Sequence, residues 1–484
     1  MKRVRIELPG AVKLILDTLG ANGEEAYAVG GCVRDAILGR KPNDWDITTS
    51  AAPEKVRACF RRTIATGIEH GTVTVMIRGT GYEVTTYRID GAYRDHRHPD
   101  RVTFTPELSE DLRRRDFTVN AMAYNPQAGL VDLFHGREDL ERGVIRAVGD
   151  PEARFSEDAL RIVRAVRFAA QLGFIIDRET YRAAAKLSPE VRHISRERVR
   201  EELMKTLTSP SPEYADLLYD MGILQDFYPE YGAYRAYRKA LMKAVPRTRT
   251  DRLSAFFMIP PESLDEENMS VLTGTADRVL GTLKFDNDTR RKVLQDLRFS
   301  GETLEADGAA LRILLWRYGP ERIKELVAFH RYARCAEAEA DRTEAAGQAR
   351  LEAEAGRTEA AEQPCTEAEK SRTKPVEQPR TETEAGHAEA AGQALKEPDG
   401  FPPYRDILDE ISRILETGEC IGLKGLAVGG NDLKALGFPA GKALGQILEA
   451  LLMRVLRDPG ENTREKLLRA AQDLRKGEGE PGTS

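Results

Sequence analysis

Two aspartates separated by one residue, Asp44 and Asp46, follow a glycine pair, Gly30 and Gly31, in the stretch AYAVGGCVRDAILGRKPNDWDITTS. Alternate residues of a strand point to the same face, so the two carboxylates would lie side by side and repel one another. A divalent cation usually neutralises such a pair, and Mg²⁺ binds one or two carboxylates together with phosphate and water oxygens. Glycines let backbone N–H groups approach a phosphate closely. These residue types therefore indicate a nucleoside triphosphate held by backbone and metal.

The elements that must position these side chains can be read from the same stretch. AYAVGG (26–31) predicts a short apolar strand that ends at two glycines, CVRDAIL (32–38) has helical spacing, and DWDITT (44–49) predicts a second strand. Arg34 lies one turn into the helix and could add a phosphate contact. Paired glycines are usually simple turns, and Asp-x-Asp is usually a surface strand or a cap. The order of glycine pair, helix and aspartate pair nevertheless favours the nucleotide site.

Two further segments carry candidate site residues. Glu83, in the strand-like segment YEVTTYR (82–88), is a candidate third catalytic acid if its strand neighbours the aspartate pair, although an exposed strand carboxylate fits equally well. The segment RRRDFTVNAMAYN (113–125) combines arginines with an acid and an amide, which can contact triphosphate oxygens and a ribose hydroxyl. Its candidates are Arg114, Arg115, Asp116 and Asn120.

The segment SEDALRIVRAVRF (156–168) predicts one helix, with Ser156 as N-cap and acids that complement the helix dipole. Capping does not account for three arginines at intervals of three residues, which would form a basic ridge over the domain boundary: Arg161, Arg164 and Arg167. Asp158 and Arg161 would be adjacent on one face of this helix.

Composition restricts the class of protein. A chain of 484 residues requires several domains. Its five cysteines are scattered without a C-x-x-C pair, which argues against a disulfide framework or a zinc site and fits a reducing compartment. No apolar run has membrane-spanning length. We therefore expect a cytoplasmic protein that does not contact a membrane.

Charge is unevenly distributed along the chain. The formal charge is −6, and residues 336–396 alone contain 8 basic and 14 acidic residues, so that 8 − 14 = −6. The remaining chain is neutral overall and has basic clusters such as LRRRDF (112–117) and RTRTDR (247–252). Because local clusters determine phosphate binding, a nucleic-acid partner is compatible with the acidic total.

Strand and helix signals divide the chain. Strand patterns such as GTVTVMIRG (71–79) mix with helices up to about residue 147, and helical patterns follow the turn AVGDP (147–151). Residues 336–398 are a low-complexity tract of Ala, Glu, Arg, Thr, Gln and Pro with the degenerate repeat RTEAAGQ. The tract has too few large apolar side chains for a core, which predicts a disordered insertion in a helical domain.

Several motifs occur in the order of a known family: GGCVRD, DWD, RRDFTVNA, GDP, EDALRIVRAVRFA, ERVREEL and the terminal LAVGGNDLKALGF…NTREKLL. On these residues the chain resembles the class II CCA-adding tRNA nucleotidyltransferases, a group that includes bacterial poly(A) polymerases. The resemblance implies an α+β fold, in which a polymerase-β-like nucleotidyltransferase head precedes helical neck, body and tail. The implied units are the catalytic head (1–147), the base-selecting neck (148–207), the RNA-binding body (208–300), the start of the tail (301–335), the insertion (336–398) and the tRNA-binding tail (399–484).

The resemblance also implies residue roles and partners. The substrates are CTP, ATP and tRNA, the cofactor is Mg²⁺, and pyrophosphate is released. Asp44 and Asp46 would be catalytic metal ligands and Glu83 a third catalytic acid. Asp158 and Arg161 would recognise the edge of the incoming base. The remaining nucleotide-binding positions are Gly30, Gly31, Arg34, Arg114, Arg115, Asp116, Asn120, Arg164 and Arg167.

Other functions remain open on sequence alone. The nearest are a poly(A) polymerase and an enzyme that adds only C or only A. TGIEHGTVTV (66–75) is more similar to the CCA-adding pattern, and residues 90–111, where the family has its flexible loop, argue against a CC-only enzyme but not an A-only one. A non-catalytic RNA-binding protein belongs to a different class, and the intact aspartate pair counts against it. The oligomeric state stays open, with a homodimer as one option.

Overall fold

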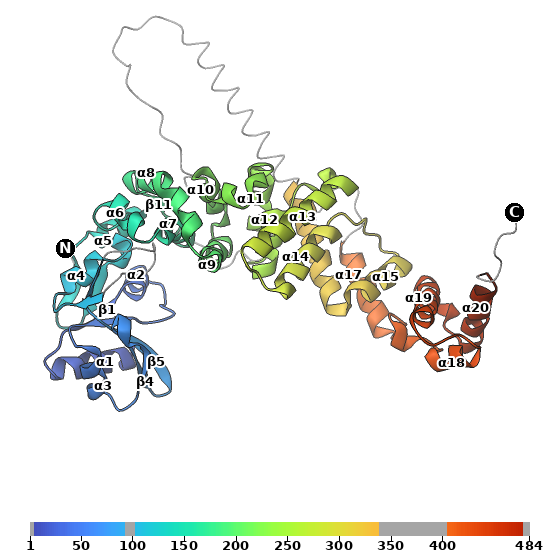
Figure 1. Cartoon of the computed structure of the whole chain (residues 1–484), viewed down its shortest axis with the longest axis horizontal. Coiled ribbons are helices and arrows are strands. Elements are labelled where there is room, and N and C mark those ends of the chain that lie inside the picture. Colours follow the sequence, from blue (N-terminus) through green and yellow to red (C-terminus); the bar gives the residue numbers. More distant parts are fainter. Residues whose placement is uncertain (1–3, 92–101, 338–403, 478–484) are drawn as a thin grey trace, which may run out of the picture.

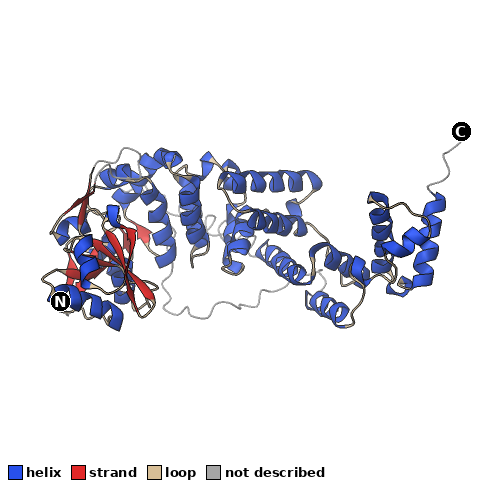
Figure 2. Cartoon of the chain, turned by 60° about the horizontal axis from the view of Figure 1, so that its bottom comes forward, coloured by secondary structure: helices blue, strands red, loops and turns tan. Residues whose placement is uncertain are grey.

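The structure is a computed structural model that describes residues 4–91, 102–337 and 404–477. The molecule is elongated, with a strand-rich head at one end and successive groups of helices leading away from it (Figure 1). Strands gather in and beside the head, and helices make up the rest (Figure 2). The predicted α+β class, with a mixed head followed by helical segments, is confirmed.

The head is built on a seven-stranded sheet with the strand order β3-β4-β5-β2-β1-β8-β9. Strands β2 and β5 pair in parallel, whereas the other neighbours are antiparallel. Small and β-branched side chains of the central strands, such as Ala28, Val73 and Val84, are buried, as suits a covered sheet. The strands are β1 (Ala26–Val29), β2 (Ile47–Thr49), β3 (Thr63–Gly67), β4 (Thr72–Ile77), β5 (Thr80–Thr86), β8 (Met122–Asn125) and β9 (Gly129–Asp132).

Short helices pack against this sheet. α1 (Gly10–Ala21) contacts β1 through a buried face of Val12, Ile15, Leu16 and Leu19, whose spacing is that of an amphipathic helix. α2 (Gly31–Ile37) contacts β1 and β8, and α3 (Pro53–Cys59) contacts β4. The remaining head elements are η1 (Ile68–His70), α4 (Leu108–Arg113), η2 (Thr118–Asn120), α5 (Gly136–Arg142) and β10 (Val144–Ile145).

The predicted strand at DWDITT is shorter than expected. β2 begins at Ile47, so Asp44 and Asp46 lie in the segment just before it. The backbone carbonyl of Asp46 still accepts a hydrogen bond from the N–H of Val29, at 3.0 Å, which continues the pairing with β1 by one residue. Trp45 is half-buried against the core, and both aspartates are exposed, so the side chains alternate as predicted.

Residues 90–111, which the sequence predicts to correspond to the family's flexible loop, lie partly outside the described residues. β6 (Arg88–Asp90) and β7 (Val102–Phe104) pair as a two-stranded antiparallel sheet on either side of residues 92–101. α4 begins at Leu108 and carries the chain to the arginine run.

The neck differs from the prediction at its first helix. The helix predicted over 156–168 is divided at Asp158, whose extended backbone ends α6 (Pro151–Glu157) before α7 (Leu160–Leu172) begins. Ser156 is therefore not an N-cap: it lies inside α6, and its hydroxyl donates to the Glu152 carbonyl at 2.8 Å. Asp150 caps α6 instead, by accepting from the N–H of Glu152. The other neck elements are β11 (Ile175–Ile176), α8 (Arg178–Leu187), η3 (Ser188–His193) and α9 (Arg196–Leu207).

The body is helical and shares a buried apolar cluster with the head and neck, because the cluster extends from Ile6 to Ala336. Its centre contains Tyr228, Tyr231, Phe256 and Phe257, whose rings pack at centroid distances of 5.1 to 5.7 Å. The elements are η4 (Pro212–Tyr214), α10 (Ala215–Asp220), η5 (Leu224–Asp226), η6 (Pro229–Gly232), α11 (Arg235–Ala244), α12 (Arg249–Phe257), η7 (Pro261–Ser263), α13 (Glu266–Thr282) and α14 (Asn287–Phe299).

Two smaller cores follow the body. One joins residues 299–327 to the buried face of α17, and the other holds the last helices together. Arg312 links these parts, since it donates to the Leu456 carbonyl at the end of α19 and to Glu419. The elements are α15 (Gly308–Tyr318), a helix over 320–337, α17 (Tyr404–Glu416), η8 (Leu423–Gly425), α18 (Gly430–Ala435), α19 (Lys442–Arg457), η9 (Pro459–Glu461) and α20 (Arg464–Gly477).

The predicted insertion (336–398) falls mostly outside the described residues. The helix over 320–337 includes the first two residues of the predicted insertion, and Ala336 is buried in the core, so residues 336 and 337 belong to the helical domain. The segments on its two sides meet: His330 Nδ1 and the Tyr404 hydroxyl lie 2.9 Å apart in a buried hydrogen bond. The chain thus leaves and re-enters the helical domain at neighbouring points.

None of the helices in the described part of the chain is both long enough and apolar enough to cross a membrane.

Candidate nucleotide-binding and catalytic site

The glycine pair makes the tight turn that the sequence predicts. β1 ends at Val29, and Gly30 has φ 82°, a left-handed conformation that side-chain-bearing residues rarely adopt. A Cβ atom placed on Gly30 would lie 3.0 Å from Arg115 Nη1, and one placed on Gly31 would lie 3.6 Å from Arg34 Nη2. Two guanidinium groups therefore lie directly against the glycine turn.

Three exposed acids lie beside this turn. Ile47 of β2 is paired with Val84 of β5, so the parallel register continues to place Asp46 opposite Glu83, one residue earlier on each strand. The pKa of Asp46 is raised to about 6, because the surrounding protein displaces water from its carboxylate and because Asp44 and Glu83 repel its charge; Arg115 opposes these effects. Asp44, Asp46 and Glu83 thus form one electrostatic group.

The acids form an open group and not a closed metal cage. Among residues 4–91, 102–337 and 404–477, no set of three or more histidine, cysteine, aspartate or glutamate side chains could hold a metal ion unaided. A cation at Asp44 and Asp46 would therefore need oxygen ligands from substrate and water.

The arginine run is organised by a residue that the sequence interpretation missed. Asp111 of α4 is fully buried, and its Oδ1 atom accepts from Arg114 Nε at 3.1 Å and Nη2 at 2.7 Å. Its Oδ2 atom accepts from Arg115 Nη2 at 3.2 Å. The signal was present in the sequence, because an acid three and four residues before two arginines on a helix is positioned to pair with both.

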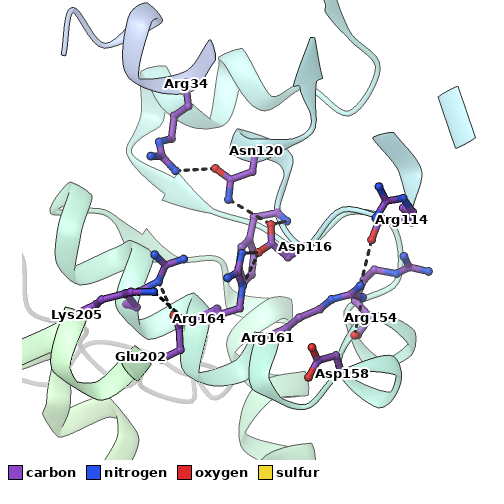
Figure 3. Close-up of polar contacts among 12 residues, drawn as sticks. Arg34, Arg114, Asp116, Asn120, Arg154, Asp158, Arg161, Arg164, Glu202 and Lys205 are labelled. Atoms are coloured by element: carbon purple, nitrogen blue, oxygen red, sulfur yellow. Dashed lines mark hydrogen bonds and ion pairs between the residues drawn. The ribbon is translucent and has the colours of Figure 1, made fainter. Parts of the chain in front are cut away.

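Asp116 and Asn120 join the head to the neck (Figure 3). Arg34 Nη1 donates to Asn120 Oδ1 at 2.7 Å, and Asn120 Nδ2 donates to Asp116 Oδ1 at 3.2 Å. Asp116 Oδ2 accepts from Arg164 Nε at 2.9 Å and from Nη2 at 2.6 Å. Burial opposes ionisation of Asp116, but Arg164 and Asn120 outweigh it and lower its pKa to about 2. The structure thus brings four of the predicted nucleotide-binding residues into one hydrogen-bonded chain.

The side chains of Asp158 and Arg161 do not pair with each other. Asp158 Oδ1 accepts from the Leu160 N–H at 3.0 Å, and Oδ2 accepts from Arg198 of α9 at 2.8 Å. Arg161 donates to Glu157 at 2.5 Å and to the backbone carbonyl of Arg114 at 3.2 Å. Asp158 lies in the break before α7, so the two residues are not on one continuous helix as predicted, although the Arg161 N–H donates to the Asp158 carbonyl at 2.9 Å.

The predicted basic ridge is also wrong, because its three arginines bind three different acids. Arg161 binds Glu157, Arg164 binds Asp116, and Arg167 Nε lies 2.6 Å from Glu202 of α9. Arg167 is buried and lies over the Phe168 ring at 3.7 Å. Burial lowers the pKa of Arg167 to about 10, although Glu202 opposes the change. Arg167 is therefore turned toward the neck interior.

Comparison with known proteins identifies the relatives of these segments. Residues 26–146 match the family described as Poly A polymerase head domain. Residues 173–234 match the family described as probable RNA and SrmB-binding site of polymerase A.

Individual relatives cover much more of the chain. A CCA-adding enzyme of Leuconostoc mesenteroides is 41% identical over 300 residues, which are 62% of this chain and 70% of the relative. The CCA-adding enzyme of Levilactobacillus brevis is 46% identical over 288 residues, 58% of this chain and 72% of the relative. Among solved structures, the Bacillus stearothermophilus CCA-adding enzyme in complex with CTP has a TM-score of 0.65 at 28% identity, over 96% of this chain and 97% of that one.

These likenesses extend through head and helical segments alike. The predicted nucleotidyltransferase family is confirmed: this chain belongs to the family of CCA-adding enzymes.

Proposed function

We propose that this chain adds the 3′-terminal CCA to tRNA, using CTP and then ATP, and releases pyrophosphate at each step. The observation that supports it most is the meeting of two features at one end of the sheet. Exposed acids lie opposite each other just before β2 and on β5, and Arg115 lies against Gly30 and acts on the charge of Asp46. A nucleoside triphosphate requires such a combination of acids for metal and arginines for phosphate.

The donor set at Asp44 and Asp46 fits Mg²⁺. Hard carboxylate oxygens are its preferred protein ligands, and the pKa of Asp46 is raised by burial first and then by the charges of Asp44 and Glu83, which Arg115 does not balance. When bound, Mg²⁺ would neutralise charge on the attacking oxygen and on the pyrophosphate. Asp44 and Asp46 would hold it, and Glu83, opposite Asp46, would add a third negative charge.

The chain's own groups would hold the rest of the nucleotide. Gly30 and Gly31 leave room for phosphate oxygens beside Arg34 and Arg115, and Arg114 adds a further cation. Asp116 and Asn120 would meet the ribose, where a hydroxyl can exchange hydrogen bonds with groups that now bind Arg164 and Arg34. Because transfer moves charge onto phosphate oxygens, positioned cations and donors would carry most of the protein's contribution.

Asp158 and Arg161 would select the base. Cytosine and adenine both present an amino donor beside a ring-nitrogen acceptor, so a carboxylate and a guanidinium can bond to both. Guanine and uracil present a carbonyl acceptor beside an N–H donor. The carboxylate would then face an acceptor, and the guanidinium would face a donor. Each unpaired polar group in a closed pocket costs about 1–3 kcal/mol, which is enough to discriminate against the wrong base. The present partners of Asp158 and Arg161 would have to release them or share their hydrogen-bonding capacity.

The helical part of the chain would hold the tRNA. We propose that the predicted neck, body and tail keep their assigned roles, with the neck at the base and the body and tail along the RNA backbone, whose shape is more accessible than its sequence. Four cysteines of the described segments carry free thiols, which suits work in the reducing cytoplasm.

The test uses tRNA lacking its last three nucleotides, with CTP and ATP offered separately and together and the products sequenced. We expect two C residues with CTP alone and a complete CCA with both. A long A tail would instead indicate a poly(A) polymerase, and addition of A only to a tRNA already ending in CC would indicate an A-adding enzyme. RNA binding without any addition would indicate a non-catalytic protein.

A further inference from the structure

One buried carboxylate connects the arginine run to the strand that follows the aspartate pair. Besides Arg114 and Arg115, Asp111 accepts a hydrogen bond from the hydroxyl of Thr48, at 3.1 Å. Thr48 is fully buried on β2, two residues after Asp46, so it lies on the same side of the strand as that aspartate. Both oxygens of Asp111 are thus occupied by donors from three residues.

Asp111 also balances charge. The guanidinium groups of Arg114 and Arg115 bind the same carboxylate and repel each other. The buried carboxylate of Asp111 offsets one of their two positive charges. Burial opposes ionisation of Asp111, yet Arg114 and Arg115 outweigh it and lower its pKa. The pair therefore retains a net positive charge, and each arginine has a fixed orientation with part of its side chain still exposed.

Contacts connect both arginines to the candidate site, through the side chain of Arg115 and the backbone of Arg114. Arg115 Nη1 lies against Gly30, and the charge of Arg115 acts on Asp46. The backbone carbonyl of Arg114 accepts from Arg161, which we assign to base selection. A change at Asp111 would therefore be transmitted to the phosphate-binding side chains first and to the base-binding side chain second.

We propose that Asp111 is a positioning residue for the triphosphate: it fixes Arg114 and Arg115 in the orientation that binds phosphate oxygens, and Thr48 fixes Asp111 relative to the strand that follows Asp46. Asp111 does not itself contact the nucleotide. This inference rests on the proposed nucleotidyl transfer and goes beyond it, because it assigns phosphate affinity to a residue outside the site.

The main test is Asp111→Asn, which keeps the shape of the side chain and removes its charge. Since hydrogen bonds to charged groups are among the strongest in proteins, we expect KM for CTP and for ATP to rise by about tenfold or more, with a smaller change in kcat. Inhibition by inorganic tripolyphosphate should weaken by the same factor. Inhibition by cytidine, which lacks phosphate, should stay as in the wild type.

Asp139 provides a matched control in the same head. It is a buried carboxylate that also accepts from one arginine, Arg146, and one threonine hydroxyl, that of Thr118. Asp139→Asn should lower the melting temperature as Asp111→Asn does. It should leave inhibition by tripolyphosphate unchanged, because Arg146 binds Asp177 on the neck and not the glycine turn.

Two further variants keep the proposal testable if Asp111→Asn folds poorly. Thr48→Val removes the hydroxyl that holds Asp111 but keeps the charges of Asp111, Arg114 and Arg115. Tripolyphosphate inhibition should therefore weaken by a smaller factor. In a chain carrying Arg114→Ala and Arg115→Ala, adding Asp111→Asn should change that inhibition by less than about twofold, since the residues through which Asp111 acts are gone.

The outcomes separate this inference from the proposed function. If the wild type adds CCA and Asp111→Asn keeps wild-type values for CTP and tripolyphosphate, only the role of Asp111 is wrong. Equal losses for tripolyphosphate and cytidine would assign Asp111 to general folding of the head. If the wild type adds no nucleotide, the proposed function fails, and calorimetric titration with tripolyphosphate still tests Asp111.

Discussion

Arg164 of the neck helix α7 donates two hydrogen bonds to a single carboxylate oxygen of Asp116 in the head, at 2.9 and 2.6 Å. The low pKa of Asp116, about 2, keeps this pair ionised throughout the neutral range. Arg164 is also 5.3 Å from the centre of the Phe168 ring, over which Arg34 and Arg167 lie as well. These charged contacts around one aromatic ring join head and neck beside the apolar core that the two share.

Replacing Arg164 by Gln should weaken the connection between head and neck. The buried Asp116 carboxylate would lose its charged partner, which we expect to lower the free energy of unfolding by roughly 1–3 kcal/mol. Nucleotide addition should fall too, because Asp116 belongs to the candidate site. Urea unfolding measures the first effect. Arg142→Gln, which breaks an exposed pair with Glu138, serves as control and should have almost no effect. An equally small effect of both variants would contradict the connecting role of Arg164.

Asp44→Asn and Asp46→Asn should each abolish most nucleotide addition without unfolding the head. Each variant removes one proposed metal ligand, and we expect the rate to fall by at least about 100-fold, as when a key electrostatic group of an active site is lost. The melting temperature should stay constant or rise slightly, because the variants relieve repulsion among exposed acids. Primer-extension assays and thermal melts measure both properties. Near-normal turnover in either variant would refute the metal assignment.

Asp158→Ala and Arg161→Ala should relax the choice of nucleotide. Each variant removes one partner of the base edge while the triphosphate stays bound, so incorporation of UTP or GTP should rise relative to CTP and ATP. The structure adds a control, since Asp158 also binds Arg198. Arg198→Met should reproduce the loss of stability caused by breaking that ion pair, but not the relaxed choice. Unchanged ratios for all four nucleotides, together with a lowered melt, would assign Asp158 and Arg161 to structure alone.

Replacing residues 338–398 by a ten-residue Gly/Ser linker should leave the melting temperature and the catalytic rate nearly unchanged. The segments on either side of the tract already meet at His330 and Tyr404. The helix continues seven residues past His330, a distance of about 10 Å that a short linker spans easily. A large loss of either property would show that the tract packs against the described part or binds substrate.

The buried His330 should make stability depend on pH. Burial, together with Arg334, lowers the pKa of His330 to about 4 from 6.5. Between these values the unfolded chain binds a proton that the folded chain does not, so stability falls as pH decreases through this window. The loss attributable to His330 is about 2 kcal/mol between pH 7 and pH 5. Urea midpoints at the two pH values should therefore differ less for His330→Gln than for the wild type. His193→Gln, at an exposed position, should keep the wild-type difference.

The sequence predicted those parts of the fold and site that depend on local patterns. β1, the turn at Gly30 and α2 follow from apolar spacing and from glycine's conformational freedom, and all three are present. The parallel neighbour that brings Glu83 opposite Asp46 was only an option in the sequence, because strand order is decided by packing of the whole sheet. The division at Asp158 was missed, since the helical periodicity of α7 continues smoothly back through residues that leave the helix.

The partners of the neck arginines could not have been predicted from spacing. Arg167 binds Glu202 and Asp158 binds Arg198, residues 35 and 40 positions apart, and both pairs exist because α9 packs against α7. A run of arginines every three residues is compatible with an exposed ridge or with several buried ion pairs. Acids on other elements, which the periodicity does not report, decide between them.

The hydrogen bond between His330 and Tyr404 has a practical consequence for protein engineering. This hydrogen bond holds the segments on the two sides of the tract close together. A foreign folded module whose termini also lie close together, such as a fluorescent reporter, can therefore be inserted there. The position is an internal insertion site, at which a label can be attached to the enzyme without using either terminus.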